Sequence, residues 1–228
     1  MESYKKITPV FVLIGSIFIS TLIVSNIIAV KLISIFGIVL PAAVIVFPIT
    51  YIFGDILTEV YGFRRARMVI WLGFFSNFVV VIFIVLAQIL PSASVWKSDE
   101  AFSQILGFAP RVLIASFTAY LFGEFSNSIV LSRVKIFTKG KFLWIRTISS
   151  TLIGEFLDSF VFITIAFIGL LPLHVVLRMA FFQWAFKVLY EIAATPVTYL
   201  IVGIVKKKEG IDTYDYRIKY NPLKLFGN

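Results

Sequence analysis

The stretch FPITYIFGDILTEVYG, Phe47 to Gly62, closes an apolar run that begins at Leu32. It contains two carboxylates, Asp55 and Glu59, and a cluster of three arginines follows it. Residues four apart share one face of an α-helix. A charge at the bilayer centre costs about 2.5–3.5 kcal/mol on insertion scales. We therefore predict a membrane helix whose two acids face the protein interior or water.

The composition is that of an integral membrane protein. Of the 228 residues, 60% are hydrophobic and 14% are charged, whereas a soluble domain carries about 25% charged residues. There is no cysteine, and the single histidine, His174, leaves no histidine cluster for a metal. We predict no cofactor and no metal. The net charge of +9 is attributed to cytoplasmic loops, so we expect no nucleic-acid partner.

Six segments are long and apolar enough to cross a bilayer, since a spanning helix needs about 20 residues. They are too long and too uniform for barrel strands of about 10 alternating residues. The predicted fold is all-α integral membrane, with six transmembrane helices. Their approximate ranges are Ile7–Val30, Ile38–Tyr61, Met68–Leu90, Val112–Leu131, Ile148–Leu170 and Val175–Val205.

Lysine and arginine alternate between the two sides of these spans. Sixteen lie on one side and four on the other, with Lys187 inside the sixth span. The positive-inside rule then predicts that both termini are cytoplasmic. We expect residues 1–208 to form the transmembrane domain and 209–228 a partly disordered cytoplasmic tail. The expected location is the inner (cytoplasmic) membrane, as a multi-pass protein.

Six acids lie within the apolar spans, and Lys187 is the one base that we count with them. Three of the acids are each nine residues from an arginine at the cytoplasmic boundary. At 1.5 Å per residue they lie about 13–14 Å deep, near the middle of a core about 30 Å thick. This matching depth predicts one polar cavity. The six acids are Asp55, Glu59, Glu124, Glu155, Asp158 and Glu191.

A short motif occurs twice, as GEFSNS at Gly123–Ser128 and as GEFLDS at Gly154–Ser159. Each copy presents an acid and, three residues later, an amide or a second acid on the same helix face. The two glycines leave room for a close approach of helices. Pro48 can start a half-helix that runs to Tyr61, a feature of transporter sites near the midplane, or it can be only a tolerated kink.

Two classes of function fit these residues. The first is a small-solute transporter with a midplane site. The second is an intramembrane lipid-modifying enzyme that uses paired carboxylates and magnesium. Such enzymes place their acids near the interface, where phosphates lie, so the depth of these acids favours transport and no enzymatic activity. Because the acids outnumber Lys187, we expect at least one of them to bind a proton.

Several motifs together resemble the queuosine precursor transporter family, also called the vitamin uptake transporter family. They are SNIIAVK at Ser25–Lys31, the stretch quoted above, the two GEF motifs, and QWAFKVLYEIAATP at Gln183–Pro196. The resemblance implies an importer of 7-cyano-7-deazaguanine, 7-aminomethyl-7-deazaguanine or queuine that works without a dedicated ATPase. A looser likeness to the substrate-binding subunits of energy-coupling-factor vitamin transporters remains the alternative.

The polar residues suit the ligand that the resemblance implies. A guanine-like edge offers two adjacent N–H donors, and one carboxylate accepts both. The predicted partners are a 7-deazapurine, the lipid bilayer and protons, and a homo-oligomer stays open. The predicted substrate-binding residues are Glu124, Asn127, Glu155, Asp158, Asp55, Glu59, Lys187, Glu191, Gln183 and Asn26.

Overall fold

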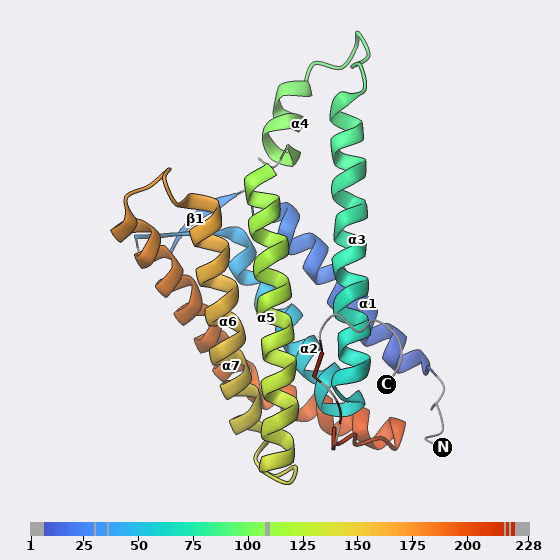
Figure 1. Cartoon of the computed structure of the whole chain (residues 1–228). Coiled ribbons are helices and arrows are strands. Elements are labelled where there is room, and N and C mark those ends of the chain that lie inside the picture. Colours follow the sequence, from blue (N-terminus) through green and yellow to red (C-terminus); the bar gives the residue numbers. More distant parts are fainter. Residues whose placement is uncertain are drawn as a thin grey trace.

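A computed structural model describes residues 7–29, 31–35, 37–107, 110–216, 218 and 220–221. Helices dominate these residues (Figure 1). A two-stranded antiparallel hairpin and a 3₁₀-helix connect the first helix to the second. The elements are α1 (Pro9–Ile28), β1 (Leu32–Ile35), β2 (Ile38–Pro41), η1 (Ala42–Ile45), α2 (Phe47–Tyr61), α3 (Phe63–Ile89), α4 (Asp99–Leu106), α5 (Pro110–Phe137), α6 (Leu143–Phe167) and α7 (Leu173–Glu209).

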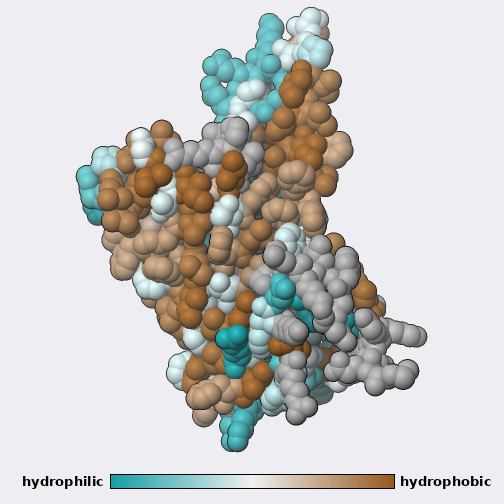
Figure 2. Space-filling view, viewed as in Figure 1, coloured by the Kyte–Doolittle hydropathy of each residue, from teal (hydrophilic) through white to brown (hydrophobic). Residues whose placement is uncertain are grey.

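The outer surface of the helices suits a bilayer. Within the described ranges, α1, α3, α6 and α7 are long and apolar enough to cross a membrane. Helix α2 has only 15 residues, and the 28 residues of α5 include charged ones. Figure 2 shows hydrophobic residues along the flanks, with hydrophilic residues gathered around α4 and at the opposite end. The chain is therefore an all-α, multi-pass membrane protein.

The predicted second helix, Ile38–Tyr61, is wrong in its first part. Residues Ile38–Pro41 instead pair with Leu32–Ile35, and the turn between these strands includes Gly37, whose φ is +77°. Proline has no backbone N–H to donate but fits the first turn of a helix. Helix α2 accordingly begins at Phe47 with Pro48 in its first turn, which confirms the predicted half-helix.

Helix α2 lies at the centre of the bundle and contacts α1, α3, α5 and α7. Twelve of its 15 residues are buried. On the side toward α1 and α3, its Ile56 and Val60 belong to the main apolar core with Phe18 and Leu22. The polar groups of α2 thus project into protein rather than lipid.

The connections between helices gather at two opposite ends (Figure 1). At one end, Thr8 Oγ1 donates to Glu209 Oε2 over 2.6 Å, which joins the start of α1 to the end of α7. The α2–α3 and α5–α6 connections lie at this same end. We call it the basic end, after its Lys135, Arg146 and Lys206. The opposite one, with β1, β2 and α4, is the hairpin end.

Candidate binding site

Lys187 links three helices in the interior. Its Nζ, on α7, lies 2.6 Å from Asp158 Oδ2 and 2.7 Å from Glu155 Oε2, both on α6. The same atom lies 4.4 Å from the centre of the Phe47 ring at the start of α2. All three charged side chains are buried. A buried ammonium held by two carboxylates and an aromatic face fixes the relative positions of α2, α6 and α7.

The two GEF motifs meet in a reciprocal contact between the antiparallel helices α5 and α6. A Cβ atom added to Gly123 would lie 2.8 Å from the Cβ of Asp158, and one added to Gly154 would lie 2.7 Å from the Cβ of Asn127. Each glycine therefore packs against the residue that lies four positions after the other glycine: Gly123 against Asp158, and Gly154 against Asn127. This confirms the predicted close approach, and it brings the acids and the amide of both motifs together.

Helices α2 and α5 supply further buried acids. Asp55 Oδ1 accepts a hydrogen bond from Asn127 Nδ2 over 2.6 Å. Glu124 packs against Gly54, where an added Cβ would lie 3.1 Å from Glu124 Oε2. Neither oxygen of Glu124 or of Glu191 has a hydrogen-bond partner among the described residues. These carboxylates are thus available to a bound donor or proton.

A small cavity lies beside Lys187, toward the hairpin end. Four of the predicted binding residues line it: Asn26, Asp158, Gln183 and Lys187.

The sequence prediction missed other residues of this cavity wall, among them Phe47, Ser116 and Phe162. The signal for Ser116 was its position seven residues before Gly123, which places both on one face of α5. Ser116 Oγ donates to Asn26 Oδ1 over 2.6 Å. The cavity therefore has polar and aromatic walls from five different helices.

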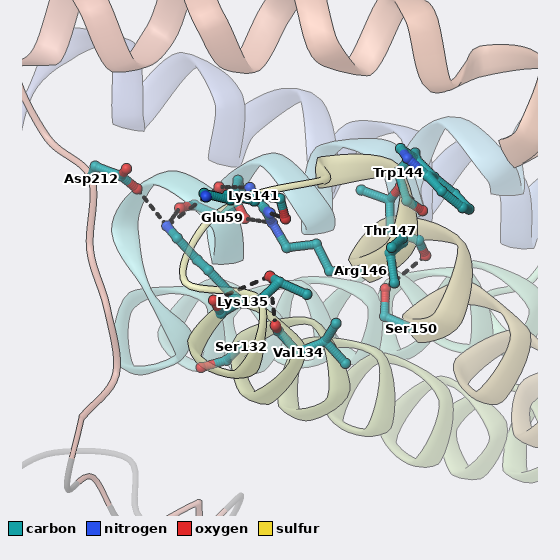
Figure 3. A network of polar contacts seen from close by, with 12 residues as sticks. Glu59, Ser132, Val134, Lys135, Lys141, Trp144, Arg146, Thr147, Ser150 and Asp212 are labelled. Carbon is teal, nitrogen blue, oxygen red and sulfur yellow. Dashed lines mark hydrogen bonds and ion pairs between the residues drawn. The ribbon is translucent and has the colours of Figure 1, made fainter.

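Glu59 does not line this cavity. It lies at the basic end, near Lys135 and Arg146 (Figure 3). Arg146 Nε and Nη2 donate to its two carboxylate oxygens over 2.6 and 2.7 Å. Lys206 Nζ lies 2.5 Å from Glu59 Oε1, and Lys135 Nζ lies 3.4 Å from the same oxygen. Lys135 also donates to the Glu59 carbonyl oxygen. Three cations thus surround one buried carboxylate.

This arrangement corrects the prediction that Lys187 is the one base accompanying six buried acids. Lys135 and Arg146 are buried, although the sequence places them outside the predicted spans. The physical reason is helix length: α5 continues to Phe137 and α6 already begins at Leu143. Glu59 is therefore paired at the basic end, and the remaining five buried carboxylates outnumber Lys187.

The segment after α7 packs on the basic end. Asp212 Oδ1 accepts from Lys135 and Lys206 over 2.5 and 2.9 Å. Partial burial raises the pKa of Asp212, but the hydrogen bonds from both lysines outweigh it and hold the pKa below its ordinary value. Asp215 Oδ2 accepts from the Phe63 backbone N–H over 2.8 Å.

Within the predicted tail, Asp212 and Asp215 are thus held by specific partners. Residues 217, 219 and 222–228 lie outside the described residues. In the described part of the chain, no group of three or more His, Asp or Glu side chains is placed to hold a metal ion.

Residues 41–201 match the model of a family described as "Putative vitamin uptake transporter". A "Probable queuosine precursor transporter" from Bacillus subtilis (strain 168) is 29% identical over 187 residues, which cover 81% of each chain. Another protein of that name, from Haemophilus influenzae, is 31% identical over 121 residues, or 53% of this chain and 49% of that protein. No solved structure matches the chain.

Proposed function

Because the chain belongs to the family described as putative vitamin uptake transporters, we propose that it imports queuosine precursors across the inner membrane. The proposed substrates are 7-cyano-7-deazaguanine, 7-aminomethyl-7-deazaguanine and queuine, and the proposed site is the cavity beside Lys187. One observation carries this assignment to the cavity. Its wall combines a carboxylate, an ammonium and two amides with aromatic rings, the groups that a flat base with donors and acceptors requires.

In this proposal the base lies against the ring of Phe47 or Phe162. The Asp158 carboxylate accepts from the ring N–H and the exocyclic amine, as carboxylates do in bidentate pairs. Gln183 and Lys187 donate to the neighbouring carbonyl. Lys187 keeps Glu155 as its ion partner at 2.7 Å, so binding does not leave the ammonium unpaired.

The deeper acids, Asp55, Glu124 and Glu191, form a second layer behind the cavity in this proposal. They and the two partners of Lys187 cannot all be ionised beside one lysine, because buried like charges disfavour ionisation. We therefore place at least one proton on this group, and uptake into proteoliposomes should respond to an imposed proton gradient. If the uptake rate does not change with the proton gradient, transport is not coupled to protons.

The proposed topology keeps six crossings and both ends in the cytoplasm, with residues 1–208 as the transmembrane domain and 209–228 as a cytoplasmic segment. Helix α2 is about 22 Å long at 1.5 Å per residue, and η1 and the hairpin complete its crossing. The basic end is then cytoplasmic. The cavity lies in the other half, which suits loading from outside, while Glu59 and its cations close the cytoplasmic end.

The test is direct binding of the three precursors to purified protein, measured by calorimetry. Asp158→Asn preserves shape but weakens acceptance from an N–H pair. Losing a hydrogen bond to a charged group should cost about 1.5–3 kcal/mol, which is roughly 10–150-fold in affinity. Asp99→Asn is the matched control, because Asp99 is an exposed acid of α4, and it should leave affinity unchanged.

Two failures are distinguishable. If folded wild-type protein binds none of the three precursors, the proposed substrate class is wrong. If the precursors bind and Asp158→Asn matches Asp99→Asn, the substrate class stands and the proposed site is wrong.

A further inference from the structure

A second chamber adjoins the proposed site. It is a small space lined by residues from the end of α1 and from α3, α5 and α6. The two chambers share four wall residues, Asn26, Ala29, Ser116 and Phe162. A ligand that fills the first chamber is therefore in contact with the boundary of the second.

The two chambers differ in charge. The first is lined by Asp158 and Lys187, whereas no acidic or basic side chain is among the described residues that line the second. Helix α3 gives the second chamber Asn77, Val81 and Ile84, which recur at the spacing of one helix face. Such a chamber accepts an apolar or weakly polar group, while a charge inside it would lack a partner.

The shared wall also contains an unused hydrogen-bond donor. Asn26 Oδ1 accepts from Ser116 Oγ, but Asn26 Nδ2 has no hydrogen-bond partner within the described ranges. Because an unpaired buried N–H is unfavourable, this amide favours a ligand that places an acceptor at the boundary between the chambers.

We propose that the second chamber takes the substituent at C7 of the deazaguanine and selects an uncharged one, a nitrile over an ammonium. This inference rests on the proposed function. The substituent is attached to C7 of the five-membered ring. This atom lies away from the N–H edge of the base, from which Asp158 accepts hydrogen bonds. The substituent therefore points from the charged chamber toward the uncharged one. The nitrile nitrogen accepts from Asn26 Nδ2, whereas the aminomethyl group would bring a cation into a chamber without a carboxylate.

The experiment compares the affinities of 7-cyano-7-deazaguanine, 7-aminomethyl-7-deazaguanine and unsubstituted 7-deazaguanine for the full-length protein. The wild type should bind the cyano compound at least about tenfold more tightly than the aminomethyl compound, because an unpaired buried charge is strongly unfavourable. Asn77→Asp places a carboxylate in the second chamber, so it should shift this ratio toward the aminomethyl compound by about tenfold.

A second variant tests the space rather than the charge. Val81 lines the second chamber but not the first, so Val81→Phe fills the second chamber alone. It should weaken binding of the cyano compound about tenfold by steric overlap, yet leave the unsubstituted base unaffected. The matched control is Val79→Phe, since Val79 on the same helix is 49% exposed.

The outcomes separate the two proposals. If the wild type binds none of the three compounds, the proposed function fails. If it binds all three equally, the second chamber does not select the substituent. If Val81→Phe leaves every affinity unchanged, the chamber holds something else, such as a lipid acyl chain, and the inference is overturned.

Discussion

Asp55 and Glu59 lie one turn apart on α2, yet their surroundings are opposite. Asp55 accepts from an uncharged amide, Asn127, while Glu59 is held by Arg146, Lys135 and Lys206. One carboxylate is thus left able to respond to a ligand or a proton. The other has a full set of cationic partners.

Glu59→Gln should strongly destabilise the protein, because it removes the only carboxylate that pairs with Arg146 in the described structure. Breaking a buried ion pair from one side costs roughly 3–5 kcal/mol. The measurement is thermal unfolding in detergent. Glu100→Gln is the control, since Glu100 is an exposed acid of α4 that accepts from Gln104. Equal melting temperatures for the two variants would contradict a structural role of Glu59.

Asp212→Asn should destabilise the protein in a pH-dependent way. The folded-state pKa of Asp212 lies below the ordinary value of 3.8, so its ion pairs stabilise the protein fully above pH 3.8. That stabilisation is lost as the pH falls through the lower, folded-state pKa. Thermal unfolding should therefore show a constant gap between wild type and variant from pH 8 to 5, and a closing gap below about pH 4. A gap that already closes near pH 6 would point to another group.

At the scale of helices, the reciprocal glycine contact sets the distance between α5 and α6. Gly154→Ala should separate them, because the new Cβ would lie 2.7 Å from the Asn127 Cβ and 3.0 Å from the Gly123 carbonyl oxygen. Overpacking of this kind costs about 1–3 kcal/mol. It should also weaken substrate binding, since Glu155 and Asp158 follow on the same helix.

Gly203→Ala is the control for that substitution. Gly203 lies on α7, and a Cβ added there meets no atom within 4 Å. Alanine also has a higher helix propensity than glycine, so this variant should be neutral or slightly more stable. If both variants unfold at the same temperature, the α5–α6 contact does not require glycine.

The helices themselves were largely predictable, because long apolar runs have few alternatives in a bilayer. The break before α2 was not predicted, since Leu32–Pro41 is as apolar as a membrane helix. Gly37 and the β-branched residues around it were the available signal. The repeated GEF motif correctly indicated a close contact between α5 and α6. Of the three acids that depth grouped together, Asp55, Glu124 and Glu155, none lines the cavity. Helical spacing and depth could not separate Glu59 from Asp55, because that difference depends on where α5 ends and α6 begins.

For the whole molecule, the basic residues gather at one end, and the proposed orientation rests on the positive-inside rule. Residues that the sequence assigns to the cytoplasmic side, such as Arg146 and Lys206, meet at one end with Thr8 and Glu209. A reporter fused after the C-terminal residue should be active if it requires the cytoplasm and inactive if it requires export. The reverse pattern would invert the proposed orientation and turn the cavity toward the cytoplasm.

The burial of α2 has a consequence for how the protein is made. Glu59 leaves the ribosome 87 residues before its partner Arg146. At about 5–20 residues per second, the interval is roughly 4–17 s. During this time α2 is too short and too acidic to settle alone in lipid. We therefore expect its insertion to wait, at the translocon or at the membrane surface, until α5 and the first turn of α6 have been synthesised. The second helix in the chain is then among the last to take its place.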